Sequence, residues 1–269
     1  MTKQLIIAEK PSVAADIAKA LGGFTKHDDY YESESHVLSS AIGHLLELSC
    51  PEEFEVKRGK WSFAHLPVIP PHFALSPIAK TESRLKLLNK LIKRKDVAGL
   101  INACDAGREG ELIFNYIAQH SKSGKPVQRL WLQSMTQGAI RDGFARLRHG
   151  NDMQGLGDAA VCRSESDWLV GINGTRAMTA FNSKTGGFHL TTVGRVQTPT
   201  LAIVVEREKK IREFKSRPYW EVEAEFAAKA GNYNGKWFDE AYKGKEDDEH
   251  ARADRLWEEK RAAAIRAAT

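Results

Sequence analysis

The chain has 269 residues, of which 42% are hydrophobic and 28% charged, and its formal net charge is +5 at pH 7. A chain of this length and composition can bury a full hydrophobic core, which excludes general disorder. The basic excess coexists with 35 acidic residues, a mixture that fits a polyanionic substrate handled by a bound metal.

The spacing of the cysteines and the lengths of the apolar runs indicate the cellular compartment of the protein. Cys50, Cys104 and Cys162 are widely separated and form neither a CxxC pair nor a Cys/His set of the kind that binds zinc. The apolar run at residues 5–8 is too short for a signal peptide or a membrane span, and no later segment is long enough. We therefore expect a cytoplasmic protein with reduced thiols, no structural zinc and no membrane partner.

Strands and helices alternate in the first 150 residues. Ser134 and Gln137 are expected to form a capping box for the last helix of this part. The expected strands are residues 4–8, 37–42, 99–103 and 127–132, and the expected helices are residues 12–21, 81–93, 111–120 and 136–147. This alternation predicts βαβ units, and therefore an α/β fold with a mostly parallel sheet and flanking helices.

Carboxylates gather where the strand at residues 99–103 meets the next helix. Asp105 leaves the strand end, and Glu109 and Glu111 fall in the first helical turn, close to one opening. Metal sites of open α/β sheets collect at the carboxyl ends of strands, and carboxylate oxygens suit Mg²⁺. Acids at a helix start also complement the helix dipole without any metal, so this stretch alone leaves both interpretations open.

A second charged turn, Glu9-Lys10-Pro11, follows the strand at residues 4–8. A charged pair at the exit of a buried strand again indicates the carboxyl edge of the sheet, next to the place where Asp105 is expected. A solvated turn is the simpler alternative.

Residues 50–77 are rich in proline and show no clear period, which predicts a long loop. Long loops in compact domains tend to be functional. Lys60 and Trp61 lie in this loop, and a basic residue beside an aromatic one can hold a phosphate backbone and stack on a base. A solvated rim with one packed tryptophan is an equal alternative.

A long helix is expected at residues 158–182, followed by a break at Gly186-Gly187. Arg163, Trp168 and Arg176 form an odd set for a purely structural helix, although a salt-bridged packing helix is the alternative.

The stretch at residues 193–201 leads into another helix. Thr198 is expected to cap this helix and Pro199 to take its first position, which leaves Arg195 and Gln197 free to meet a phosphate. The helix at residues 199–214 is expected to bury Leu201, Val204, Val205 and Ile211. The rest of the chain predicts a strand at residues 219–226, a partner strand at residues 235–237 and a helix at residues 249–268.

Four stretches together resemble the motifs of one family. They are Ile-Ala-Glu-Lys-Pro-Ser at residues 7–12, Asp-Ala-Gly-Arg-Glu-Gly-Glu at residues 105–111, Arg163 with residues 167–169 and 171–177, and Gly-Arg-Val-Gln-Thr-Pro at residues 194–199. In this order they are similar to the amino-terminal part of a type IA DNA topoisomerase, of the topoisomerase III kind. The resemblance runs from Lys3 to about Trp220.

The resemblance implies a domain order and an activity. Residues 1–152 would form a Rossmann-like Toprim domain, residues 153–215 a helical DNA-groove segment, and residues 216–269 the truncated beginning of a β-rich arch domain. Enzymes of this family cut one DNA strand through a tyrosine, pass another strand through the break and reseal it, with Mg²⁺ and without a nucleotide. They relax negatively supercoiled DNA and decatenate DNA, so the implied partner is single-stranded or negatively supercoiled DNA.

The resemblance also assigns site residues. Glu9 would be a metal ligand or the proton donor to the leaving 3′ oxygen, and Lys10 would steady the scissile phosphate. Glu9, Asp105 and Glu109 would hold Mg²⁺. The residues that would line the groove for single-stranded DNA are Lys60, Trp61, Arg163, Trp168, Arg176, Thr192, Val193, Gly194, Arg195, Val196 and Gln197.

The sequence departs from the family pattern at two places. Gly107 replaces the middle carboxylate of the usual Asp-x-Asp-x-Glu motif, which removes one hard ligand. None of the six tyrosines lies in the Tyr-x-Arg-Thr context of the family's nucleophile. We therefore expect the chain to stop before the nucleophile domain, and the isolated chain to bind DNA and metal without cleaving DNA.

Two alternatives remain from the sequence. One is a Toprim nuclease or primase-like enzyme, which would share Glu9 and the motif at Asp105 but not the motif at residues 194–199. The other is a non-catalytic fragment that grips single-stranded DNA. A nucleotide-driven motor is disfavoured because no glycine-rich loop ends in Gly-Lys-Ser or Gly-Lys-Thr.

Overall fold

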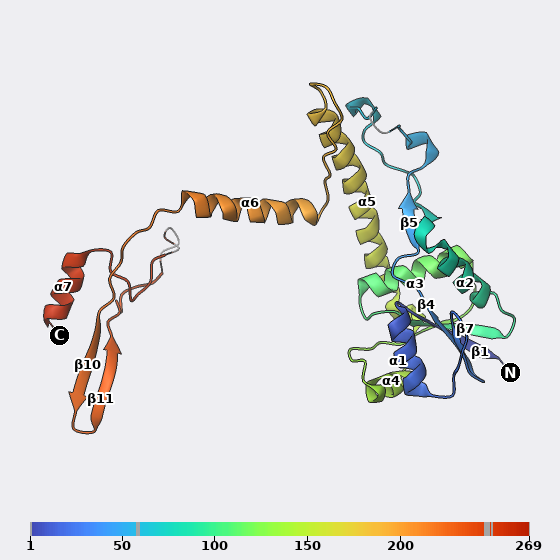
Figure 1. Ribbon diagram of the computed structural model, residues 1–269, viewed down its shortest axis with the longest axis horizontal. Helices are drawn as coiled ribbons and strands as arrows, with labels where there is room; N and C mark the ends of the chain where they lie inside the picture. Colours follow the sequence, from blue (N-terminus) through green and yellow to red (C-terminus); the bar gives the residue numbers. More distant parts are fainter. Residues whose placement is uncertain (1, 58–59, 245–247, 249, 269) are drawn as a thin grey trace. The chain divides into compact units, whose positions relative to one another are not determined.

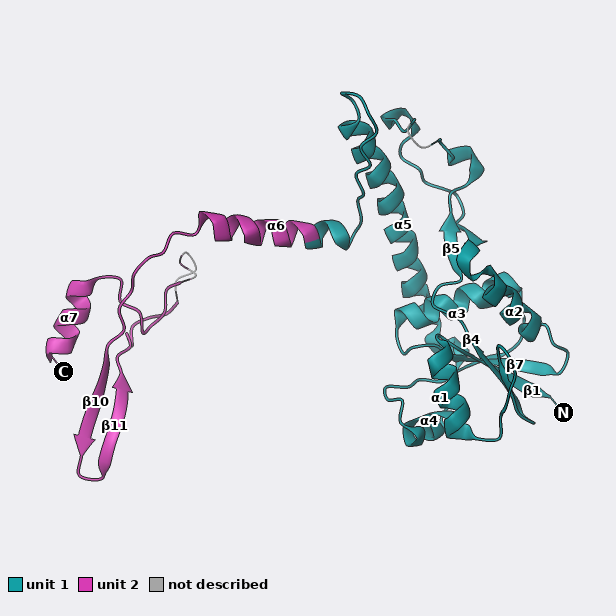
Figure 2. Cartoon of the chain, viewed as in Figure 1, with its two compact units in different colours: residues 1–200 teal, residues 201–269 magenta. Residues whose placement is uncertain are grey.

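The computed structural model describes residues 2–57, 60–244, 248 and 250–268. The chain divides into two compact units, residues 1–200 and residues 201–269 (Figure 2). The division falls within the helix α6, Gln197–Glu213. No helix in the described part of the chain is long and apolar enough to cross a membrane.

The first unit is built on a seven-stranded sheet with the order β2-β3-β4-β1-β7-β8-β9. Its four central strands are mutually parallel, which confirms the predicted mostly parallel sheet: β4 (His36–Ser40), β1 (Lys3–Ala8), β7 (Val97–Ala103) and β8 (Val127–Arg129). The edges are antiparallel and were not predicted, because two-residue strands are too short to show a period: β2 (Thr25–Lys26), β3 (Tyr31–Glu32) and β9 (Arg148–His149).

Helices cover both faces of this sheet, so β1 is buried on both sides. Leu5 and Ile7 pack into one hydrophobic cluster, whereas Ile6 and Ala8 pack into another, as the alternation of side chains along a strand requires. The helices α1 (Pro11–Leu21) and α4 (Gln137–Phe144) cover one face, and α2 (Glu82–Ile92) and α3 (Arg108–Ser121) cover the other (Figure 1).

The predicted capping box of α4 is wrong in its residues. Thr136 is the N-cap, and its hydroxyl accepts a hydrogen bond from the Ala139 backbone N–H at 3.3 Å. Ser134 instead accepts a hydrogen bond from the Thr136 backbone N–H at 3.4 Å. The local threonine therefore takes the capping position that Ser134 was expected to fill.

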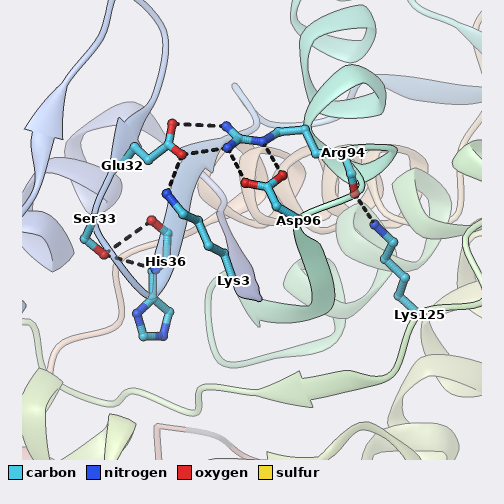
Figure 3. A network of polar contacts seen from close by, with 7 residues as sticks. All are labelled: Lys3, Glu32, Ser33, His36, Arg94, Asp96 and Lys125. Carbon is cyan, nitrogen blue, oxygen red and sulfur yellow. Dashed lines mark hydrogen bonds and ion pairs between the residues drawn. The ribbon is translucent and has the colours of Figure 1, made fainter. Parts of the chain in front are cut away.

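A network of ion pairs lies at the amino ends of β1 and β7 (Figure 3). Arg94 Nη2 lies 2.6 Å from Glu32 Oε1 and 2.7 Å from Asp96 Oδ2, and Lys3 Nζ lies 2.6 Å from Glu32 Oε1. Lys125 Nζ donates to the backbone oxygens at the end of α2, including that of Arg94 at 3.0 Å. These contacts join β3, which lies between β2 and β4, to the amino ends of β1 and β7.

The long loop expected at residues 50–77 contains regular structure. Its last residues form β6 (Ala74–Pro77), which pairs antiparallel with β5 (Leu46–Ser49). Short 3₁₀ helices occupy Glu52–Phe54 and Phe63–His65, and others lie at Ala79–Thr81 and Gly150–Met153. The Asn173 side chain accepts from the Val68 N–H at 2.6 Å and donates to the Val68 oxygen at 2.8 Å, which fastens the loop to the long helix.

The long helix α5 runs over Gln154–Asn182, so it begins four residues before the predicted start at 158. The helix α6 begins at Gln197, and the predicted cap at Thr198 is therefore wrong. The Thr198 hydroxyl lies within the first turn and accepts a hydrogen bond from the Gly194 backbone N–H at 3.0 Å.

The second unit contains an antiparallel hairpin of β10 (Glu223–Ala228) and β11 (Gly231–Lys236), and a helix α7 (Glu259–Ala268). The strand predicted from 219 starts later, because Trp220 forms a lone bridge with Leu256. The helix predicted from 249 also starts later, and residue 249 lies outside the described residues. On α6, Leu201, Val204, Val205 and Ile211 are exposed, contrary to prediction, since none of the described residues covers them.

Candidate functional site

The parallel pairing of β1 with β7 brings two carboxylates together at the carboxyl ends of the strands. Ala8 is in register with Ala103, so the residues that follow the two strands emerge side by side. The Asp105 backbone N–H donates to Glu9 Oε2 at 3.2 Å, and Glu9 is only 8% exposed. The predicted meeting of the two charged turns at one sheet edge is therefore confirmed.

Lys10 bridges these carboxylates. Its Nζ atom lies 3.5 Å from Glu9 Oε1 and 3.5 Å from Asp105 Oδ2. The negative charges of Asp105 and, second, Glu9 raise the pKa of the Lys10 ammonium above its ordinary value. The side chain of Lys10 is more than half exposed, so this cation can reach an anion that approaches from solvent.

Glu109 belongs to a different contact. Its Oε2 atom lies 3.4 Å from His44 Nε2, and its side chain is 63% exposed. Within the described part of the chain, no three His, Cys, Asp or Glu side chains are grouped closely enough to form a metal site. The structure thus joins Glu9 and Asp105 directly but does not add Glu109 to them as a third close carboxylate.

Glu111 lies in the core, so its predicted place beside Glu109 at the opening is wrong. Two residues along a helix differ by about 200° in direction, which turns Glu111 away from the side that Glu109 faces. Glu111 is buried and forms an ion pair with the Arg129 guanidinium. It also accepts a hydrogen bond from the Asn102 side chain at 3.2 Å.

Arg129 holds the turn that carries Asp105, and sequence reasoning missed it. The residue ends β8, is 1% exposed, and has its guanidinium bonded to Glu111. The same guanidinium donates to the backbone oxygens of Asn102, Cys104, Asp105 and Leu130 at 2.7–3.1 Å. The available signal was an arginine inside an apolar strand, a residue that burial requires to be paired.

Two glycines shape this turn in different ways. A Cβ atom added at Gly110 would lie 2.1 Å from the Asp105 backbone oxygen, so only glycine allows α3 to start this close to Asp105. A Cβ atom added at Gly107 would meet no described atom within 4 Å. The glycine that replaces the family's middle carboxylate is therefore not required by space.

The donor chemistry of the turn fits a divalent cation. Glu9 and Asp105 offer carboxylate oxygens that already share one cation, the Lys10 ammonium. Mg²⁺ needs few protein ligands because it retains several water molecules. Two converging carboxylates are therefore enough protein ligands of the right type for Mg²⁺.

Two of the three predicted groove arginines share one acid on α5. Arg195 Nη1 lies 2.8 Å from Asp167 Oδ1, and Arg163 Nε lies 3.7 Å from Asp167 Oδ2. Trp168 packs edge to face on Phe73, with ring centroids 5.6 Å apart. Arg195 and Arg163 therefore lie together on one side of the helix.

Arg176 is buried and Trp61 is half-buried beside it. Arg176 is 7% exposed, donates to the Phe54 backbone oxygen at 2.8 Å, and lies over the Trp61 ring at 5.8 Å from its centroid. The Trp61 Nε1–H donates to the Val56 oxygen at 3.2 Å. Both residues hold the loop against α5, whereas the neighbouring Lys60 is exposed.

The segment at residues 192–197 leads from α5 into α6. Thr192, Arg195, Val196 and Gln197 are exposed, whereas Val193 and Gly194 are partly covered. The contact of Arg195 with Asp167 places this segment beside α5, the helix that carries Arg163.

Comparisons with known proteins agree with this arrangement. Residues 4–135 match the family model of the Toprim domain, and residues 151–269 match the family model described as DNA topoisomerase. DNA topoisomerase 3 of Bacillus cereus (strain ATCC 14579) is 43% identical over 226 residues, which is 84% of this chain and 30% of that protein. The chain belongs to the type IA DNA topoisomerases.

A second relative and one solved structure are also similar to this chain. DNA topoisomerase 3 of Shouchella clausii (strain KSM-K16) is 41% identical over 225 residues, 84% of this chain and 30% of the relative. Full-length topoisomerase I from Thermotoga maritima shares the fold, with a TM-score of 0.52 and 21% identity over 81% of this chain and 32% of that structure. The chain thus spans about a third of the length of these proteins.

Proposed function

We propose that this chain is the metal-binding and DNA-binding part of an enzyme of the topoisomerase III kind. The whole enzyme would break one DNA strand, pass another strand through the break and rejoin it, without ATP, relaxing negative supercoils and decatenating DNA. The observation that carries this proposal is the cluster of Glu9, Lys10 and Asp105 at adjacent strand ends, with Lys10 3.5 Å from each carboxylate.

Each residue of the cluster takes one role in the proposal. Lys10 pairs with the phosphate at which the strand breaks, because it is a cation whose side chain is more than half exposed to solvent. Glu9 and Asp105 hold Mg²⁺, and Glu109, which contacts His44 in the structure, is proposed to turn from His44 and add a further carboxylate from α3. Alternatively, a protonated Glu9 would give its proton to the leaving 3′ oxygen instead of binding the metal. A bound Mg²⁺ supplies charge stabilisation as negative charge develops on the phosphodiester oxygens.

The single-stranded DNA partner is proposed to lie along α5 and residues 192–197. Arg195, Arg163 and Lys60 supply cations for the phosphate backbone, and Gln197 a hydrogen-bonding amide. Thr192, Val193, Gly194 and Val196 are proposed to contact the strand beside them. Trp168 offers an aromatic ring, while Arg176 and Trp61 support the loop that carries Lys60.

The chain alone is proposed to bind DNA without cutting it. Its six tyrosines lack the Tyr-x-Arg-Thr context. We propose the same domain division as the sequence indicates: a Toprim domain at residues 1–152, a helical groove segment at residues 153–215, and part of an arch domain from residue 216.

The experiment is a fluorescence anisotropy titration with a labelled single-stranded oligonucleotide at several salt concentrations. The wild type is expected to bind with an affinity that falls steeply with salt. Arg195→Ala is expected to weaken binding by about tenfold, while Arg207→Ala, an exposed arginine on α6, changes it less than twofold. Equal effects of both variants would reject the proposed groove, and a covalent DNA adduct would reject the non-cleaving role.

A further inference from the structure

We propose that side chains on one stripe of α5 fix residues 189–193 in a single register, and that Thr175 and Thr179 thereby position Arg195 and Gln197. This inference rests on the proposed function, because it gives Thr175 and Thr179 their purpose through the DNA contacts of Arg195 and Gln197. The hydrogen bonds themselves can be tested without DNA.

The two threonines pair with alternate residues of the returning segment. The Val193 backbone N–H donates to Thr175 Oγ1 at 3.0 Å, and the same hydroxyl donates to the Val193 oxygen at 3.4 Å. One helical turn later, the Thr191 backbone N–H donates to Thr179 Oγ1 at 3.0 Å. Thr179 is 1% exposed, so water does not compete for that bond.

The stripe continues to the end of the helix. The His189 backbone N–H donates to Ser183 Oγ at 3.1 Å. Asn182 Nδ2 donates to Thr191 Oγ1 at 2.7 Å, which adds a side-chain contact to the backbone ones. Residues 193, 191 and 189 thus meet residues 175, 179 and 183 in turn.

This pairing works because two spacings match. Four residues of an α-helix rise about 6 Å, and two residues of an extended chain rise about 6.6 Å. Each step of two residues along the segment therefore meets the next turn of α5, and the backbone N–H groups of a segment outside any sheet find partners.

The contact of Gly174 with Val193 sets which register is used. A Cβ atom added at Gly174 would lie 2.7 Å from Val193 Cγ1, so the valine occupies the space that a larger residue would fill. Sliding the segment by two residues would keep the spacing match but remove Val193 from this hollow. The register in turn places Arg195, two residues further on, 2.8 Å from Asp167.

The test is hydrogen exchange of the Val193 and Thr191 amides, combined with single-strand affinity, in the full chain. Thr175→Val keeps the shape and removes the hydroxyl. It should speed exchange of the Val193 amide about fivefold or more and weaken binding of a labelled oligonucleotide three- to tenfold. Thr175→Ser should restore both within twofold.

Ser166→Ala is the matched control, because its hydroxyl donates to the Cys162 oxygen within the same helix, at 2.7 Å, and not to residues 189–193. Thr179→Val is the second variant, read at the Thr191 amide. Unchanged exchange in both threonine variants would overturn the proposed pairing of residues 189–193 with α5. Faster exchange with unchanged DNA affinity would overturn the positioning role. If the wild type binds no single-stranded DNA, the proposed function and the positioning role both fail, while amide exchange still tests the pairing of residues 189–193 with α5.

Discussion

Arg129 and Glu111 form a buried ion pair behind the turn that carries Asp105. The Arg129 side chain is 1% exposed and that of Glu111 4%. The guanidinium also donates hydrogen bonds to four backbone oxygens around the turn. The carboxyl end of β7 is therefore held by a cation from the neighbouring strand. The conformation that presents Asp105 to solvent thus depends on a residue that no ligand would touch.

Removing one partner of this pair should be costly. Arg129→Met leaves a buried carboxylate without its cation, so we expect it to lower the free energy of unfolding by about 3–5 kcal/mol. The double variant Arg129→Met/Glu111→Gln should lose less than Arg129→Met alone, because no charge remains unpaired. Urea unfolding measures both, and a double variant less stable than the single one would contradict this account.

The ion pairs in Figure 3 predict an acid-sensitive contribution to stability. Hydrogen bonds from Arg94, and then from Lys3, lower the pKa of Glu32 from 4.5 to about 2. A lowered folded-state pKa stabilises the protein above the unfolded value, and this stabilisation is lost as the pH falls from about 4.5 towards 2.

The measurement is the free energy of unfolding between pH 6 and pH 3 for the wild type and Glu32→Gln. The variant should be less stable by about 1–2 kcal/mol at pH 6, since solvent screens part of the network, and the gap should shrink at pH 3. Glu34→Gln, on an exposed neighbour, is the control. A gap that stays constant with pH would show that Glu32 acts through packing.

Lys10→Ala should separate metal binding from phosphate binding. The ammonium lies 3.5 Å from both carboxylates, so it opposes a divalent cation there and attracts a phosphate. The variant should bind Mg²⁺ about fivefold more tightly and single-stranded DNA more weakly. Lys19→Ala, an exposed lysine on α1, should change neither. Weaker Mg²⁺ binding by Lys10→Ala in calorimetry would place the metal elsewhere.

Gly107→Asp should raise metal affinity without loss of fold. A Cβ atom at Gly107 would meet no described atom within 4 Å, and the φ of 166° is extended backbone that any residue adopts. An added carboxylate gives Mg²⁺ another hard ligand, so we expect at least tenfold tighter binding. Gly107→Asn, of the same size without the charge, should gain little, and equal gains by both variants would argue against direct ligation.

The sequence predicts those features that depend on local periodicity. The buried strands β1 and β7 show as apolar runs, and parallel strands place their carboxyl ends together, which puts Glu9, Lys10 and Asp105 at one edge. Glu111 was misplaced because its direction depends on where α3 begins and on a partner, Arg129, that lies 18 residues away.

Long-range pairing also explains the other differences. Arg176 pairs with a backbone oxygen 122 residues earlier, so no local pattern could show that it is buried. The helical period of α6 was recognised, but a period gives the direction of apolar side chains and not the identity of what covers them. The metal and DNA roles of the site residues stay predictions.

The most direct test of the account is a Mg²⁺ titration of the chain by calorimetry. The wild type should bind Mg²⁺, and Glu9→Gln and Asp105→Asn should each weaken binding about tenfold or more, because each removes one of two converging carboxylates. Asp16→Asn, an exposed acid on α1, should leave the affinity unchanged. Equal Mg²⁺ affinity in the wild type, Glu9→Gln and Asp105→Asn would contradict a metal site at the carboxyl ends of β1 and β7.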